Sequence, residues 1–258
     1  MMRVAVAKTY KLYVGGAFVR SESGRHDQVG GANVPRGSRK DVRDAVKVAR
    51  GAAGGWGKRT AYNRGQILYR AAEALESRAG EFGDDVGEAI DTFVHYAGWT
   101  DKLHAVLGTV NPVAAPFLSM STPEPTGVVA VVLGADASLP ALVENIAAPL
   151  AAGNVVVVQL PEADPLPGLD LGEVLGVSDI PAGVVNLLSG RASELVPALA
   201  SHRDVNAIID ATGDAELSAQ IDTFASETLK RVLRTESDPL DRLAALTEIR
   251  TVWHPIGA

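Results

Sequence analysis

Two segments of the sequence end in polar side chains that could take part in chemistry. In "GNVVVVQLPE" a continuously apolar run stops at Gln159, with Glu162 close behind, and in "VNAIIDATGD" a second apolar run leads to Thr212, Gly213 and Asp214. A glutamine amide can hydrogen-bond a hydroxyl group but supplies no charge to a phosphate. An aspartate suits the start of a helix and repels an anionic ligand placed at the same point. We favour a helix cap for Asp214 and a strand-end role for Gln159.

Nucleophilic and metal-binding groups are scarce. The chain has no cysteine, which excludes a thiolate nucleophile, thiolate metal sites and disulfides. Its five histidines are scattered, with no spacing suited to a metal. Gly190 in "LLSGRASEL" could belong to a turn that approaches a phosphate, but Ala192 stands where a second glycine is expected, so a plain turn between a strand and a helix is favoured. We therefore assign no catalytic residue and no metal ligand.

The composition is that of an ordinary globular protein. Of 258 residues, 47% are hydrophobic and 21% are charged. The net charge of −7 gives nucleic-acid binding no electrostatic basis. No apolar run approaches the roughly 20 residues needed to span a bilayer, and the first residues contain no secretory apolar segment. We expect a cytoplasmic protein that binds neither nucleic acid nor membrane.

The N-terminal third predicts a hairpin followed by a layer of helices. Residues 11–20, "KLYVGGAFVR", contain two short β-type runs around a pair of glycines. Ser38 precedes apolar residues at i, i+3, i+4 and i+7, so a serine-capped helix is predicted that ends at residues 54–55. Further helices are predicted from about residue 61 and over roughly residues 88–107.

From residue 127 onward, strand–turn–helix units repeat. The apolar strands "GVVAVVL", "NVVVVQ", "GVVNLL" and "VNAIID" alternate with helical segments, the last over about residues 214–229. Such strands are typical of a parallel sheet covered on both faces. The predicted fold class is α/β: an open, Rossmann-like parallel sheet with flanking helices, an N-terminal hairpin and helical layer, and a C-terminal strand. Residues 234–245, polar and interrupted by Pro239, are predicted as a linker, and residues 246–258 as a β-rich tail.

The order of these segments resembles the aldehyde dehydrogenase superfamily. The resemblance rests on "SRKDVRDAV", "AYNRGQILYRAAEALE", "YAGWTDKL", "EPTGVVAVV", "APLAAGNVVVVQLPEADPL", "IPAGVVNLLSG" and "DVNAIIDATG", which occur in the family's order. It covers roughly residues 10–232 and implies that residues 1–233 form the family's cofactor-binding domain with its bridging elements. Residues 234–245 would then replace the catalytic domain, and residues 246–258 would correspond to the oligomerisation tail.

The resemblance also implies chemistry whose groups are missing from this sequence. The family's enzymes oxidise aldehydes by thiolate attack, hydride transfer to NAD(P) and glutamate-assisted deacylation. There is no cysteine, and "LRTESDP" stands in place of the glutamate motif. Asp136 takes the place of the asparagine that donates to the oxyanion, and a carboxylate cannot donate a hydrogen bond at neutral pH. We expect a truncated, catalytically incomplete family member.

The cofactor groove implied by the resemblance is altered as well. Gln159 sits where the family keeps a lysine that reaches the adenosine ribose, and Asp214 replaces a serine beside the pyrophosphate. Glu162, Thr212 and Gly213 match the family's pattern. These five residues would form a vestigial groove, in which residual ribose contact by Gln159 is the alternative to a purely structural role. We expect NAD(P) binding to be weak or lost.

The tail "LTEIRTVWHP" places Ile249, Thr251 and Trp253 on one face of a strand and Val252 on the other. In complete enzymes the equivalent strand packs across a subunit boundary, so the resemblance implies an oligomerisation role for Ile249, Val252 and Trp253. Because an exposed tryptophan is costly to leave in water, burial against a partner is favoured over burial against the chain itself.

The sequence therefore predicts a non-catalytic structural or regulatory subunit. It would form a homo-oligomer or a hetero-oligomer, and a complete aldehyde dehydrogenase is the natural partner that the resemblance suggests. The alternative is an NAD(P)-binding oxidoreductase subunit of the same family. An active oxidoreductase is the least favoured interpretation, because no cysteine is present.

Overall fold

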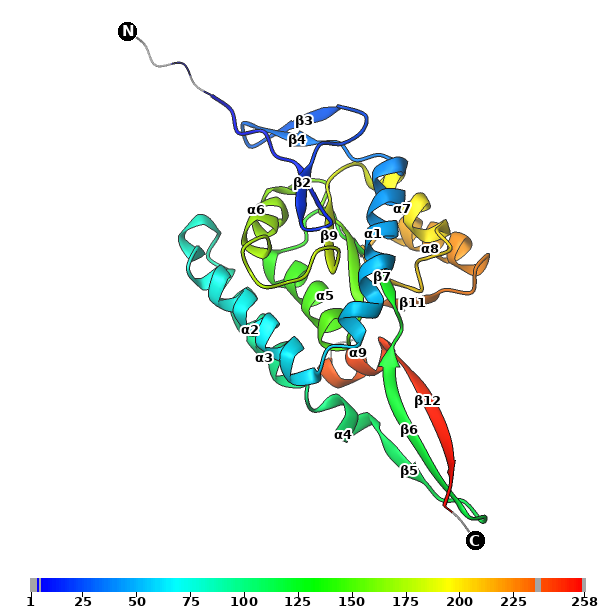
Figure 1. The fold of residues 1–258 in the computed structure, drawn as a ribbon. Coiled ribbons are helices and arrows are strands. Elements are labelled where there is room, and N and C mark those ends of the chain that lie inside the picture. The colour runs from blue at the N-terminus through cyan, green and yellow to red at the C-terminus, as the bar shows by residue number, and fades with distance from the viewer. Residues whose placement is uncertain (1–3, 5, 235–237, 257–258) are drawn as a thin grey trace.

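A mixed seven-stranded sheet forms the centre of the protein (Figure 1). The computed structural model describes residues 4, 6–234 and 238–256. The strand order is β11-β10-β7-β8-β9-β1-β2, in which β7 to β11 run parallel and the β1–β2 hairpin is antiparallel. The α/β prediction is confirmed, and the N-terminal hairpin extends the edge of this sheet.

The helices and strands follow one another along the chain as predicted for the α/β part, with additions at both ends. The strands are β1 (Leu12–Val14), β2 (Ala17–Val19), β3 (His26–Val29), β4 (Ala32–Pro35), β5 (Thr109–Asn111), β6 (Phe117–Pro125), β7 (Val128–Leu133), β8 (Val155–Gln159), β9 (Val185–Leu188), β10 (Ala207–Ala211), β11 (Arg231–Arg234) and β12 (Thr247–Pro255). The helices are α1 (Arg39–Gly57), α2 (Ala61–Glu76), the 3-10 turn η1 (Ala79–Glu81), α3 (Val86–Trp99), α4 (Leu103–Leu107), α5 (Leu139–Ala151), α6 (Leu166–Leu175), α7 (Ala192–Ser201), α8 (Ala215–Ser226) and α9 (Pro239–Ala245).

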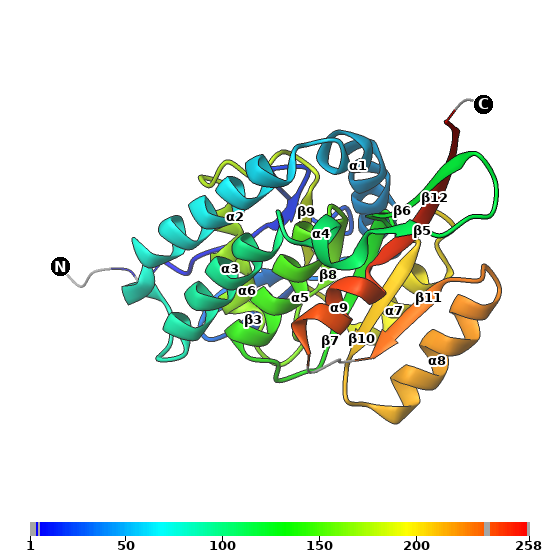
Figure 2. The same ribbon diagram turned by 90° about the horizontal axis from the view of Figure 1, so that it is seen from below.

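Helices cover both faces of the parallel strands. The connection from β7 through α5 leads to β8, whereas β10 lies on the other side of β7. Because crossovers between parallel strands are right-handed as a rule, this reversal of the strand order is expected to place α5 and α6 on one face of the sheet and α7 and α8 on the other. In Figure 2 α2 and α3 lie outside α5, and α7 and α8 lie across the sheet from them. Every residue of β7 and β8 is buried, as expected for strands covered on both faces.

The N-terminal helices differ from the prediction at their ends. Ser38 and Asp41 form the predicted cap as a reciprocal capping box. Helix α1 continues past residues 54–55 to Gly57, because Trp56 is buried and donates to the Leu150 carbonyl at 3.1 Å. The single helix predicted over residues 88–107 divides into α3 and α4.

The prediction of a linker over residues 234–245 is wrong for the part that the structure describes. Residues 235–237 lie outside the described residues, and residues 239–245 form α9. Asp238 caps this helix and Pro239 occupies its first turn, where a proline needs no N–H partner. Leu243 is fully buried, and α9 contacts α5. The segment is a packed helix that leads directly into β12.

A three-stranded antiparallel sheet of β5, β6 and β12, which we call the arm, projects from the body (Figure 1). Strand β12 pairs with β6 over its whole length, from Thr247 opposite Pro125 to Pro255 opposite Phe117. The predicted C-terminal strand therefore joins a sheet of its own chain. In the part of the chain that the structure describes, no helix has both the length and the apolar character needed to cross a membrane.

Candidate functional site

The turn after β10 brings Thr212, Gly213 and Asp214 together at the start of α8. Asp214 is the predicted helix cap: its Oδ1 accepts from the backbone N–H groups of Glu216 at 2.8 Å and Leu217 at 3.1 Å. Gly213 has φ +64°, the left-handed conformation that glycine adopts without strain. The N–H groups at the start of α8 have no partner within the helix and could bind an anion. Here they are bonded to the chain's own carboxylate.

Behind this turn, the buried carboxylate of Asp210 is the centre of a hydrogen-bond network. Its carboxylate accepts from the hydroxyl groups of Thr212 at 2.7 Å and Ser218 at 2.6 Å. Arg234 at the end of β11 approaches it at 3.4 Å and also forms a bidentate pair with Asp222. The hydrogen bond that Arg234 donates to Asp222, the first cause, raises the pKa of Arg234, which keeps its charge. The hydroxyl of Thr212 is therefore engaged inside the protein.

Gln159 ends β8, as predicted, but its side chain does not reach solvent. It is fully buried, and its amide nitrogen donates to the Leu160 carbonyl. Its Oε1 has no hydrogen-bond partner among the residues that the structure describes. A buried oxygen without a partner costs about 1–3 kcal/mol. In this conformation Gln159 offers no polar atom to a ligand at the surface.

Glu162 lies on the surface after β8, at the start of α7. Its Oε2 accepts a 2.8 Å hydrogen bond from the backbone N–H of Ala192, where Arg191 supplies no side-chain cap. A cavity of about 190 Å³ is lined by Glu162 together with Asp27, Gly190 and Arg191. The predicted plain turn at Gly190 is tight, because a Cβ there would lie 3.0 Å from the Gly37 nitrogen.

The loops after β7 and β10 meet at the point where the strand order of the sheet reverses. This point is the usual ligand crevice of an open α/β sheet. The Gly134 N–H donates to the Ala211 carbonyl at 3.0 Å, and a Cβ on Gly134 would lie 2.9 Å from the Thr212 carbonyl oxygen. The backbones of the two loops are thus in direct contact. The structure brings Thr212, Gly213 and Asp214 together at the start of α8. Glu162 is not among them and lines the cavity beside Arg191 instead.

Asp136, in the loop after β7, faces a second cavity of about 520 Å³. Its wall includes Phe82, Leu139 and Leu166, and it carries five carboxylates: Glu81, Asp85, Asp136, Asp164 and Asp170. Two of them have basic partners, since Arg78 pairs with Glu81 and Lys8 with Asp170. No group of three or more side chains among the described residues has the geometry to hold a metal ion.

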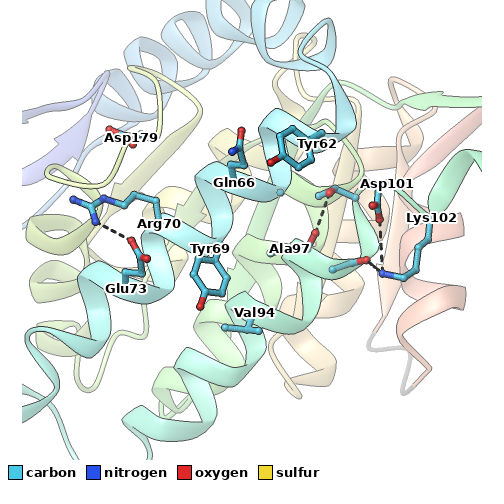
Figure 3. Close-up of a pocket in the computed structure, with 13 residues that line it drawn as sticks. Tyr62, Gln66, Tyr69, Arg70, Glu73, Val94, Ala97, Asp101, Lys102 and Asp179 are labelled. Atoms are coloured by element: carbon cyan, nitrogen blue, oxygen red, sulfur yellow. Dashed lines mark hydrogen bonds and ion pairs between the residues drawn. The ribbon is translucent and has the colours of Figure 1, made fainter.

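A cavity of about 600 Å³ lies between α2 and α3 and was not predicted (Figure 3). Tyr62 and Tyr69 of α2 stand at its rim with much of their surface exposed, and Val94 of α3 faces them. Four of the charged side chains in it form two pairs, the first between Arg70 and Glu73. Lys102 lies beside Asp101 and donates to a carbonyl of α3. The sequence signal that could have indicated this cavity is the pair of tyrosines at i and i+7 of one helix, Tyr62 and Tyr69.

The arm carries the predicted oligomerisation residues in the predicted alternation. Ile249 lies opposite Pro123 and Trp253 opposite Ser119 on one face, and Val252 lies opposite Met120 on the other. Trp253 contacts Phe117 edge-to-face with ring centroids 6.1 Å apart, yet 59% of its surface is exposed. Ile249 and Val252 are also exposed. Contact with the chain itself therefore covers only part of the tryptophan.

Comparison with known proteins shows which family this sequence is similar to. The profile of the aldehyde dehydrogenase family matches residues 23–235. The chain is 32% identical to mouse (Mus musculus) cytosolic 10-formyltetrahydrofolate dehydrogenase over 85% of its own length and 27% of the relative's. It is 30% identical to the putative aldehyde dehydrogenase DhaS of Bacillus subtilis, over 87% of this chain and 50% of that protein.

Solved structures agree with the sequence comparison. The aldehyde dehydrogenase of Bacillus cereus, solved in complex with NAD+, superimposes with a TM-score of 0.80 at 25% identity, over 88% of this chain and 50% of that one. HpcC from Thermus thermophilus gives a TM-score of 0.82 at 28% identity, over 88% of this chain and 48% of that one. The chain thus spans about half the length of these structures and about a quarter to a half of the curated relatives. It belongs to the aldehyde dehydrogenase family.

Proposed function

We propose that this chain is a non-catalytic member of the aldehyde dehydrogenase family that acts as a structural or regulatory subunit and assembles through the arm. The arm is the observation that carries the proposal. Its sheet exposes Ile249 and Trp253 on one face and Val110, Met120 and Val252 on the other. A projecting sheet with apolar side chains on both faces gains free energy when a partner covers it.

The absence of a thiol supports the non-catalytic part of the proposal. The family's oxidation requires a thiolate nucleophile, and this sequence has no cysteine. Asp136 supplies a carboxylate where the resemblance places an amide donor. The expected result is that the isolated chain forms no NADH or NADPH from aldehydes. A steady NADH signal that disappears on a point change in the Thr212–Asp214 turn would overturn this.

The contacts of the cofactor edge support weak or lost NAD(P) binding. The donors that could meet a pyrophosphate are bonded to Asp210 and Asp214, and Gln159 is buried. These residues fit a dinucleotide poorly. The alternative function, an NAD(P)-binding oxidoreductase subunit, would show itself as micromolar NAD+ affinity in calorimetry of the unmodified chain.

A complete aldehyde dehydrogenase is the proposed hetero-partner, and a cytoplasmic location is part of the same proposal, supported by the cytosolic relative. The test is isolation of the native protein followed by mass spectrometry. A complete family member in stoichiometric amount supports the proposal. Trp253→Asp should release it, whereas the control Val177→Asp, at a position that is exposed outside the arm, should not. Equal retention by both variants would contradict assembly through the arm.

A further inference from the structure

Strand β12 has a free edge whose backbone groups can be identified. It is the terminal strand of the arm, in the order β12-β6-β5. The N–H of Ile256 donates to the Pro116 carbonyl, and the Leu246 carbonyl accepts from Thr126, so even-numbered residues direct their backbone groups toward β6. The Thr247 carbonyl instead accepts from the Arg231 side chain, which lies on the opposite side. Because backbone groups alternate along a strand, the odd-numbered residues face the free edge.

The sequence of this edge is complementary to itself. When β12 is reversed about Thr251, Ile249 falls opposite Trp253, and Glu248, whose carboxylate also accepts from Arg231 at 2.7 Å, falls opposite His254. An aliphatic side chain opposite an aromatic one, and a carboxylate opposite an imidazole, are favourable cross-strand pairs. Arg250 falls opposite Val252, so that no like charges meet.

We propose that β12 pairs antiparallel with β12 of a second copy of this chain, with the two-fold axis at Thr251, so that two arms form one continuous six-stranded sheet. This inference rests on the proposed assembly function of the arm and gives the pairing strand and the register of its homo-oligomeric form. Ile249, Thr251 and Trp253 have N–H and C=O groups directed to the free edge. In this register they oppose one another as hydrogen-bonded pairs.

Neighbouring registers are less favourable for definite reasons. A shift that pairs odd with even residues would place edge-directed groups opposite groups already used by β6. An axis at Arg250 would set that guanidinium against its own copy, and an axis at Val252 would place Arg250 opposite His254. Only the axis at Thr251 keeps the nine residues of β12 in full overlap, from Thr247 opposite Pro255.

The ends of the strand fit the same register. Thr247 lies opposite Pro255 of the second copy. One of the two backbone hydrogen bonds that such a residue pair would normally form is missing here. The carbonyl of Thr247 is already bonded to Arg231 at 2.9 Å, and a proline has no N–H. The only backbone groups that could not pair across the axis are therefore groups that need no partner there.

A second copy also covers the exposed apolar surface of the edge strand. Ile249 is 56% exposed and Trp253 is 59% exposed, on the same face of the sheet. Ile249 of each copy would pack against Trp253 of the other, beside the Phe117 ring that already contacts Trp253. A partner without this sequence would not reproduce both the Ile249–Trp253 and the Glu248–His254 pairs.

Single-cysteine cross-linking tests the axis, because the chain has no cysteine of its own. Thr251→Cys places the two thiols at the axis, where the Cα atoms of a hydrogen-bonded pair lie about 5.5 Å apart, within the range for a disulfide. Mild oxidation should give a covalent dimer. The matched control is Val110→Cys, exposed on β5 of the same arm, which should remain monomeric on denaturing gels. Equal cross-linking of the two variants, or none by Thr251→Cys, would overturn the register.

Light scattering over a range of protein concentrations tests the dimer itself. The wild-type chain and Thr251→Val should reach dimer mass, whereas Thr251→Lys, which sets two ammonium groups against each other at the axis, should stay monomeric at concentrations at least about tenfold higher, equivalent to about 1.4 kcal/mol. Circular dichroism confirms that each variant is folded. A wild-type monomer that still retains a complete aldehyde dehydrogenase would overturn self-pairing and leave the proposed function standing. Absence of both assemblies would overturn both.

Discussion

The carboxylate of Glu162 accepts a 2.8 Å hydrogen bond from the backbone N–H of Ala192, which makes a residue after β8 the cap of helix α7. The resemblance assigns Glu162 to a cofactor groove, yet in this structure its oxygen satisfies a helix terminus. The same substitution of roles occurs at Asp214, which caps α8. Both carboxylates sit at the positive ends of helices, where a ligand's phosphate would otherwise be stabilised.

Glu162→Ala should therefore lower the free energy of unfolding by about 0.5–2 kcal/mol, the usual cost of losing a cap. Glu162→Gln should recover most of that loss, because the amide oxygen can still accept from Ala192. Urea denaturation of the three proteins checks this. If Glu162→Ala were as stable as the wild type, the carboxylate would have no capping role.

Changes at Asp214 separate helix capping from ligand repulsion. Asp214→Asn and Asp214→Ser keep a side chain that can cap α8 but remove a charge that would repel a pyrophosphate. We expect both variants to bind NAD+ about fivefold to tenfold more tightly than the wild type, corresponding to about 1 kcal/mol for an exposed charge. Isothermal calorimetry gives the affinities. Asp214→Ala is the control that loses the cap and should also be less stable. Unchanged affinity in all three variants would show that this carboxylate does not limit binding.

The Asp210 network should contribute to stability in proportion to burial. The carboxyl group of Asp210 is 1% exposed and that of Asp222 is 53% exposed, although both contact Arg234. Asp210→Asn should cost about 1–3 kcal/mol, because buried donors lose a charged acceptor. Asp222→Asn should cost less than about 1 kcal/mol, as exposed ion pairs do. Chemical denaturation of both variants makes the comparison, and equal losses would contradict it.

Tyr96 of α3 gives the protein an alkaline pH dependence. Burial, the first cause, and the nearby Glu144 carboxylate raise the pKa of Tyr96 to about 12. The unfolded chain releases this proton near pH 10, whereas the folded protein retains it. The contribution is therefore fully present below pH 10 and is lost as pH rises toward about 12, by up to about 3 kcal/mol.

Tyr96→Phe should remove this contribution. Urea denaturation between about pH 9 and 11.5 should show a shallower loss of stability in the variant than in the wild type. The other tyrosines titrate in both proteins, so their contributions cancel in the difference. Parallel pH curves would mean that Tyr96 ionises at the same pH in the folded and unfolded states.

The sequence patterns predicted those parts of the fold that depend on local order. Continuous valine runs and a serine cap identify the parallel strands and α1, because burial on two faces and helix capping leave direct traces in sequence. The sequence does not indicate strand β6, because "FLSMSTPEP" contains two prolines and mixes polar with apolar residues, and its pairing with β12 arises only in the folded chain. The sequence pattern does not indicate helix α9, because a proline within a polar segment is typical of a linker, whereas Pro239 occupies a helix start.

The candidate site was predictable to a similar depth. The turn of Thr212, Gly213 and Asp214 and the capping role of Asp214 follow from residue types next to a strand. Which donors are already bonded does not, because the acceptor of the Ala192 N–H is Glu162, 30 residues earlier, and Asp210 binds Ser218 of α8 as well as Thr212. The cavity between α2 and α3 likewise depends on how two helices pack.

Truncation of the arm provides the last prediction, and the structure fixes where the cut must fall. Leu246 is fully buried, and its carbonyl accepts from the Asn154 amide at 2.9 Å, so it belongs to the body. Deleting residues 249–258 should leave the α/β body folded, because residues 249–256 contact the arm strand β6 and Pro116 beside it. Deleting residues 246–258 should cost about 2–5 kcal/mol more, the range for removing a large buried aliphatic side chain. Circular dichroism and urea denaturation compare the two truncations, and light scattering reports their mass. The shorter deletion should be folded and monomeric. If it unfolds, β12 stabilises the body as an internal strand, and assembly through the arm loses its main physical support.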